Sequence, residues 1–236
     1  MESSWSLASA ACNHLRPNGI SADMQSVTEQ PRQASPAGHP QPLAALGDTL
    51  YVGTWDTDSI YPIDTSTWTP GPAVAAPGKP YGMAQLDGAI RVVISVGEDD
   101  DRYLYTYAPD KGFDPHSQIA LPELSGSHLA SDGTTLYLLQ MGNRKIVSLD
   151  AGGAVKAEHP LPVRLAGIGF ANGALYGIAG DEEFENLHFA SIDLSGSEAV
   201  VTPIAAMDDE ARGLTFDGKA WWTSYRDVDT IGAFTP

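Results

Sequence analysis

The sequence predicts an all-β protein, a single five-bladed β-propeller built from four-stranded antiparallel blades. Five segments repeat one pattern, in which an apolar run precedes a turn of Gly with Asp or Asn and then a strand rich in Leu, Tyr and Trp. The turn glycines recur at intervals of 41, 45, 40 and 45 residues, which is the spacing of propeller blades. Helical periodicity is missing from the region of the repeats. The segments are 43–53, 83–95, 129–139, 168–178 and 214–224, with turn glycines Gly47, Gly88, Gly133, Gly173 and Gly218.

Each repeat continues with a third strand, such as SIYPID (59–64), and a weaker fourth strand, such as PAVAAP (72–77). The fifth repeat stops after its third strand, TIGAF, so its outer edge needs a partner. We expect residues 23–30 to supply that N-terminal strand and close the last blade. The five blades then occupy residues 41–236 of one domain that spans residues 1–236.

The first 22 residues precede this closing strand. Trp5, Ala8, Ala11, Cys12 and Leu15 fall at helical spacing, which predicts a short N-terminal helix over residues 1–22. A disordered tail is the alternative.

Cys12 is the single cysteine, so no internal disulfide forms and a reducing compartment such as the cytoplasm is favoured. A mature secreted form is the alternative.

The charge of the chain is strongly acidic, with 30 Asp and Glu against 13 Lys and Arg and a formal net charge of -17. Such a chain repels polyanions, so we expect neither nucleic acid nor an anionic membrane as a partner. The same charge favours a soluble protein, and we expect a monomer.

Two phrases, LYLLQMGNRKIVSLD and AWWTSYRDVDTIGAF, resemble the NHL, YncE and SMP-30 groups of β-propellers. The resemblance covers residues 43–236 at the level of strand pattern. These groups include lactonases, lyases, binding modules and scaffolds, so the resemblance implies the fold and leaves the activity open. The acidic and tryptophan motifs of the propeller-type glutaminyl cyclases find no match in the chain.

The face that carries function follows from the blade geometry. The second-to-third loops and the blade-to-blade links lie on one face, at the mouth of the central channel. Loops held by a rigid scaffold are where binding usually occurs. The links supply His39, Lys79, Tyr81, His128, Arg164, Glu210 and Arg212, and the loop entrances add Trp55 and Tyr225.

These residues predict a cationic channel mouth inside an acidic rim, and guanidinium groups suit carboxylates and phosphates. The leading hypothesis is a propeller that binds a small anionic or peptidic ligand there. The alternative is a lyase or hydrolase, similar to streptogramin lyases or lactonases, with His128 or Tyr81 as acid or base and Arg212 stabilising negative charge. A second alternative is a protein-interaction scaffold whose acidic rim docks a basic partner. Arg164 and Arg212 would have a purely structural role if they paired with Asp209 and Glu210 across the channel.

No cofactor and no metal site are predicted. Calcium-dependent lactonases similar to SMP-30 hold their metal with oxygen ligands from several blades, whereas Glu210 is the one obvious channel carboxylate here. The acidic run Asp99, Asp100 and Asp101 lacks the spacing of an EF-hand loop.

We therefore expect millimolar calcium to leave the melting temperature nearly unchanged, because only a ligand that prefers the native state stabilises it. Thermal unfolding with and without calcium tests this expectation. A rise of more than about 5 °C, equivalent to at least about 1–2 kcal/mol in a chain of this length, would show that a calcium site exists.

Overall fold

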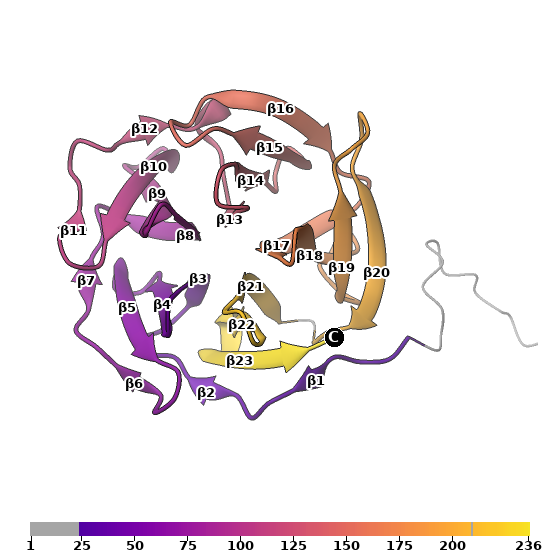
Figure 1. Cartoon of the computed structure of the whole chain (residues 1–236), viewed down its shortest axis with the longest axis horizontal. Helices are drawn as coiled ribbons and strands as arrows, with labels where there is room; N and C mark the ends of the chain where they lie inside the picture. The colour runs from indigo at the N-terminus through magenta and orange to yellow at the C-terminus, as the bar shows by residue number, and fades with distance from the viewer. Residues whose placement is uncertain (1–23, 209) are drawn as a thin grey trace, which may run out of the picture.

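The protein is a five-bladed β-propeller in a computed structural model that describes residues 24–208 and 210–236 (Figure 1). Five antiparallel sheets surround a central axis, and in four of them the chain runs from the innermost strand outwards, whereas the outer strands of the fifth come from the N-terminal end of the chain. The prediction of five blades with four strands each is confirmed. The predicted N-terminal helix lies outside the described residues. None of the helical segments among the described residues is long and apolar enough to cross a membrane.

Blades 1 and 2 each end in two short outer strands that pair with the same third strand. Blade 1 contains β3 (Pro40–Leu46), β4 (Thr49–Thr54), β5 (Ser59–Asp64), β6 (Thr69–Pro70) and β7 (Val74–Ala75). Blade 2 contains β8 (Lys79–Leu86), β9 (Ala89–Val96), β10 (Asp101–Ala108), β11 (Gly112–Phe113) and β12 (Ile119–Ala120).

Blades 3 and 4 have one continuous outer strand each. Blade 3 contains β13 (His128–Ser131), β14 (Leu136–Gln140), β15 (Lys145–Leu149) and β16 (Val155–Pro160), preceded by a 3-10 turn at Pro122–Leu124. Blade 4 contains β17 (Arg164–Ala171), β18 (Ala174–Gly180), β19 (His188–Asp193) and β20 (Val200–Ala206). Blade 5 contains β21 (Ala211–Phe216), β22 (Trp221–Tyr225), a 3-10 turn at Arg226–Val228 and β23 (Thr230–Thr235), with β1 (Thr28–Glu29) and β2 (Gln33–Ala34) outside.

The innermost strands of neighbouring blades approach each other closely around the channel. A Cβ atom on Gly167 would lie 2.1 Å from the carbonyl oxygen of Arg212, and one on Gly213 would lie 2.3 Å from that of Gln41. Both positions therefore require glycine. The register shifts at these positions, between Leu165 and Gly167 and between Ala211 and Leu214, as expected of β-bulges that re-aim side chains.

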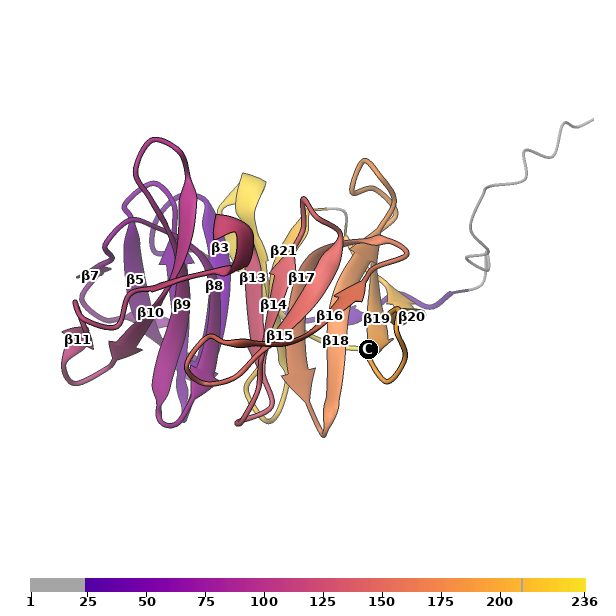
Figure 2. The same cartoon turned by 90° about the horizontal axis from the view of Figure 1, so that it is seen from above.

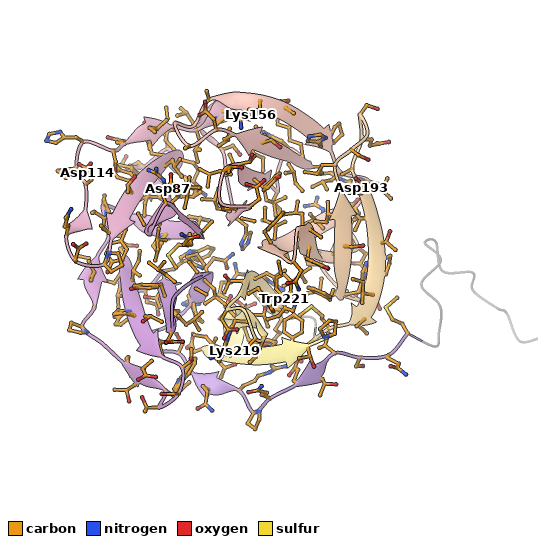
Figure 3. The ribbon with its side chains drawn as sticks, in the orientation of Figure 1. Asp87, Asp114, Lys156, Asp193, Lys219 and Trp221 are labelled. Carbon is orange, nitrogen blue, oxygen red and sulfur yellow. The ribbon has the colours of Figure 1, made fainter. Side chains whose placement is uncertain are left out.

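The hydrophobic core lies between the blades. Trp221, labelled in Figure 3, packs between blades 4 and 5 with its ring 5.1 Å from that of Phe189. Its neighbour Trp222 points to the other side of the same strand and packs between blades 5 and 1 with Leu43. Adjacent residues of a strand face opposite sides, so this pair of indoles joins blade 5 to both of its neighbours.

The N-terminal segment closes the last blade, as predicted. Thr28 pairs with Thr235 and Glu29 with Phe234, and beyond them Gln33 pairs with Ile231. The predicted boundaries, 23–30, lie closer to the N-terminus than the observed closing strands, which fall between Thr28 and Ala34. Pro31 has no backbone N–H to donate, and it separates the two short strands that pair with β23.

Polar contacts reinforce this closure. The Tyr225 hydroxyl donates to Glu29 Oε1 at 2.7 Å, and the Arg32 guanidinium lies 3.4 Å from the centre of the Tyr225 ring. Arg32 also pairs with Glu29 at 3.1 Å and with Asp208 at 3.0 Å. Burial, together with the hydrogen bond to the Glu29 carboxylate, raises the pKa of the Tyr225 phenol.

We expect Tyr225→Phe to lower the free energy of unfolding by about 1–3 kcal/mol, because it removes a part-buried hydrogen bond to a carboxylate. Urea unfolding measures the change. The matched control is Tyr61→Phe, which removes a longer, 3.2 Å contact to the nearby Thr57 hydroxyl on an exposed surface. Equal losses in the two variants would contradict a special role of Tyr225 in closure.

Candidate functional site

The channel mouth lies on the face that carries the second-to-third loops and the starts of the innermost strands. The opposite face carries the tight turns with Gly47, Gly88, Gly133, Gly173 and Gly218, all at positive φ. Figure 2 shows the ring edge-on, with loops projecting from both faces. We call these faces the mouth face and the turn face.

An aromatic pair from two blades lies on the mouth face. The rings of Trp55, directly after β4, and Tyr81, in β8, are 4.7 Å apart between centroids. Trp55 Nε1 donates to the Pro80 carbonyl at 2.7 Å, which fixes the indole against blade 2. A β-bulge between Pro80 and Gly82 turns Tyr81 out of the regular alternation of its strand.

Three cations surround this pair. The Arg226 guanidinium, from the loop after β22, lies 5.0 Å from the centre of the Trp55 ring, and Lys79 Nζ lies 5.5 Å from it. The Arg102 guanidinium lies 3.7 Å from the centre of the Tyr81 ring. Each arrangement is a cation–π contact. We call Trp55, Lys79, Tyr81, Arg102 and Arg226 the mouth cluster.

Acidic residues of the rim hold the arginines in place. Arg102 donates to Asp100 Oδ2 at 2.7 Å and to the Gly126 carbonyl at 3.1 Å, and Ser95 donates to the same carboxylate. The hydrogen bond from Arg102 lowers the pKa of Asp100 below its usual range. Arg226 pairs with Asp227 at 3.0 Å. The rim carboxylates therefore orient cations that belong to the channel mouth.

His128 and Gln41 meet in the channel from non-adjacent blades, with their Nε2 atoms 3.0 Å apart. Both are buried, at 3% and 4% exposure. In this orientation of the amide, Gln41 donates, so His128 Nε2 accepts and the imidazole proton is on Nδ1. Gln41 Oε1 is also buried and has no hydrogen-bond partner among the described residues.

The electrostatic surroundings of His128 are positive. Burial lowers its pKa to about 3, and the charges of Arg226 and Arg212 contribute to the decrease. The imidazole is therefore neutral at pH 7. For Tyr81, burial is the largest effect and raises the pKa of the phenol, while Arg102 opposes the increase.

Two of the remaining predicted site residues, His39 and Arg164, do not belong to the mouth cluster. His39 lies half-exposed on the rim, where its ring bonds to Asp56 at 2.7 Å. Arg164 pairs with Glu182 at 2.8 Å and faces the Phe184 ring, so its carboxylate partner lies on the rim of its own blade. The pairing of Arg164 with Glu210 across the channel is not the arrangement that the described residues show, and Asp209 lies outside them.

Three further predicted residues lie on blade 5 or its link. Arg212 Nη1 donates to the carbonyl of Ala211 at 2.9 Å, and its charge contributes to lowering the pKa of His128. Glu210 lies at the start of blade 5 with Oε2 buried and without a hydrogen-bond partner among the described residues. Tyr225 is fully buried and bonds to the closing segment, so we leave it out of the candidate site.

Three residues of the site were missed at the sequence level: Gln41, Arg102 and Arg226. Arg102 and Arg226 belong to the loops GEDDDR and SYRDVD, in which every other charged residue is acidic. The single arginine in each loop is the feature that could have indicated a cation at the channel mouth. Gln41 stands between Pro40 and Pro42 in a blade-to-blade link, and its type and position alone do not show that it faces a histidine from another blade.

Comparisons with known proteins identify the fold and no family. No protein-family model matches the chain, and no curated protein matches its sequence. Glutaminyl cyclase from Myxococcus xanthus is similar with a TM-score of 0.66 and 12% identity, over 89% of this chain and 96% of that one. Virginiamycin B lyase from Staphylococcus aureus is similar with a TM-score of 0.52 and 18% identity, over 86% of this chain and 82% of that one. PQQ-bound aldose sugar dehydrogenase from Streptomyces coelicolor is similar with a TM-score of 0.53 and 15% identity, over 84% of this chain and 80% of that one.

These structures are all propeller enzymes with different activities, so the likeness concerns architecture. The resemblance to the NHL, YncE and SMP-30 groups is not confirmed by name and stays a prediction.

The buried neutral imidazole has a measurable consequence. Between about pH 6.5 and 3 the unfolded chain binds a proton at residue 128 and the folded chain does not, so His128 destabilises the fold as the pH falls. We expect the wild type to lose about 1.4 kcal/mol per pH unit relative to His128→Gln, or about 3 kcal/mol by pH 4.5. Urea unfolding of both proteins between pH 7 and 4 measures the difference. Parallel stability curves would contradict a buried neutral imidazole.

Proposed function

We propose that the protein binds a small anionic or peptidic ligand, through its carboxylate or phosphate group, at the mouth cluster. The observation that supports it best is the convergence of Lys79, Arg102 and Arg226, from two blades, on the Trp55–Tyr81 pair. Guanidinium groups bind carboxylates and phosphates by paired hydrogen bonds, and the adjacent rings offer an apolar surface for the rest of the ligand.

The surroundings of the cluster also favour an anion. Arg226 and Arg212 both lower the pKa of His128, which means that the positive potential reaches into the channel despite the net charge of -17. An anion bound near these guanidinium groups would offset that potential. Its binding and the protonation of His128 are therefore coupled, and an anionic ligand should raise the pKa of the imidazole.

Gln41 supports a ligand with more than one polar group. Its buried Oε1 lacks a donor among the described residues, and an unsatisfied buried acceptor costs about 1–3 kcal/mol. An N–H or O–H group on the ligand would satisfy it while the anionic group binds the arginines. A peptide or a hydroxy acid combines both groups in one molecule.

A lyase or hydrolase acting at the same site is the second candidate. A neutral imidazole in the channel is the observation that favours it, and one solved neighbour is a catalytically inactive histidine-to-alanine variant of virginiamycin B lyase with quinupristin. General-base catalysis works best with a pKa near the working pH, and a pKa of about 3 is far below that range. Binding therefore ranks ahead of catalysis, unless a bound anion raises the basicity of His128.

A thermal-shift and calorimetric screen with inorganic phosphate, citrate, succinate, glutamate and glycylglycine tests the proposal. We expect at least one of these anions to stabilise the wild type, and Arg226→Gln to weaken its binding by about 2–5 kcal/mol, or about 30-fold to several thousand-fold. The matched control is Arg144→Gln, since Arg144 is also on the mouth face and also pairs with a rim carboxylate, Glu182, but does not belong to the mouth cluster.

If none of the anions stabilises the wild type, or if Arg226→Gln and Arg144→Gln bind equally well, the proposal is wrong. Turnover of quinupristin or a simple lactone by the wild type, lost in His128→Gln while anion binding is retained, would move the enzyme hypothesis ahead.

A further inference from the structure

A second hollow lies on the outer perimeter, at the seam between the closing segment and blade 1. Its volume is about 290 Å³. The connection from β1 to β2 forms one wall and the turn from β5 to β6 forms the other, and β2 and β6 are neighbours on the perimeter in Figure 1. It is lined by Gln30, Pro31, Gln33, Thr65, Ser66, Thr67, Trp68, Trp222 and Ala233.

The lining of this hollow carries no charged side chain, although the chain has 43 acidic and basic residues in total. Its polar groups are two carboxamides, Gln30 and Gln33, and the hydroxyls of Thr65, Ser66 and Thr67. A charged ligand would lose its hydration here without gaining an ion pair. The carboxamides and the Thr65 hydroxyl can instead both donate to and accept from a neutral ligand that is rich in hydroxyl groups. The Ser66 and Thr67 hydroxyls donate to Asp64 and Thr69, and each can still accept a hydrogen bond from the ligand.

Two indoles complete the hollow. Trp68 and Trp222 stack with their ring centroids 5.8 Å apart and their planes at 17°. Trp68 Nε1 donates to the Ala34 carbonyl at 2.9 Å, and Trp222 Nε1 donates to Asp217 Oδ2 at 2.8 Å. Because both N–H groups are already bonded, the indoles are held rigidly and offer ring surface rather than hydrogen bonds to a ligand.

The backbone at Trp68 is unusual. Its φ is +51°, whereas the left-handed residues in the corresponding turns of blades 2 and 3 are glycines, Gly112 and Gly153. A non-glycine residue in this conformation costs about 1–2 kcal/mol. The indole offsets part of this cost by bonding to β2. The bond from the Trp68 indole is sufficient to anchor β2. The uncharged polar residues around the indole are not needed for that anchoring, and we therefore interpret them as ligand contacts.

We propose that this hollow binds a neutral saccharide, one sugar ring at a time. The apolar C–H face of a pyranose would pack on the exposed part of the Trp68 ring, and its hydroxyls would bond to the amides of Gln30 and Gln33 and to the threonine and serine hydroxyls. A volume of about 290 Å³ suits a ligand of that size. The hollow is separate from the mouth cluster, and this inference does not depend on the anion-binding proposal.

The test is a titration of the full chain with D-glucose, D-galactose, D-mannose, N-acetyl-D-glucosamine and maltose, each up to about 50 mM, followed by tryptophan fluorescence and NMR. We expect one of these sugars to bind saturably. The double variant Gln30→Ala/Gln33→Ala should weaken its binding at least about 10-fold, with an unchanged melting temperature because both side chains are exposed. Gln118→Ala, an exposed glutamine on blade 2, is the matched control and should bind as the wild type.

Arg226→Gln should bind the sugar as well as the wild type, which separates this site from the mouth cluster. Three results would overturn the inference. They are the absence of saturable binding by all five sugars, equal losses in the Gln30/Gln33 and Gln118 variants, and binding of D-glucose 6-phosphate in preference to D-glucose.

Discussion

Closure of the ring is the constraint on which the rest of the structure depends. Blade 5 owns only three strands, and residues 28–34, from the other end of the chain, supply its outer edge. At the inner edge, Ser224 Oγ accepts from the Gly213 N–H and donates to the Gln41 carbonyl, each at 2.9 Å. Trp68 of blade 1 also donates to the Ala34 carbonyl of the closing segment, so blade 1 contacts blade 5 at both edges, and Arg226 lies over Trp55 at the same seam.

The channel mouth shows how local arrangement overrides overall charge. A chain with a net charge of -17 would repel an anion at long range, and this repulsion is screened beyond about 8–10 Å at physiological salt. Within that range the charges of Arg226 and Arg212 contribute to lowering the pKa of His128 in the channel. Asp100 and Asp227 orient two arginines of the mouth cluster, so the acidic rim and the cationic centre form one electrostatic unit.

The two candidate sites differ in chemistry and in origin. The mouth cluster collects charged and aromatic residues from loops, whose length and composition vary between blades. The perimeter hollow forms where a displaced strand meets the neighbouring blade, and its residues are uncharged. Both sites include a tryptophan whose N–H is bonded to a backbone carbonyl from another element, Trp55 to Pro80 and Trp68 to Ala34. In each case the bond holds an indole across a seam of the ring.

The sequence by itself determined the blade number, the turns and the need for a closing strand, because these depend on patterns local to each repeat. A glycine turn between two strands of alternating apolar residues indicates a hairpin wherever it occurs. A missing fourth strand is found by counting the strands of each repeat. Strand order also predicted which loops and links share one face, because it fixes on which side of a blade each connection lies.

The tertiary structure decided which side chains meet. Tyr225, at a loop entrance by sequence, bonds to Glu29 of the outer strand β1, nearly 200 residues away in the chain, whereas Arg226, its neighbour, lies over Trp55. Arg164 bonds to Glu182 of its own blade, and Gln41 bonds to His128 across the channel. The bulges and the Arg164–Glu182 pair lie within single blades. The close glycine contacts and the bonds from Tyr225 to Glu29 and from Gln41 to His128 join segments that are far apart in the chain, so no single repeat encodes them.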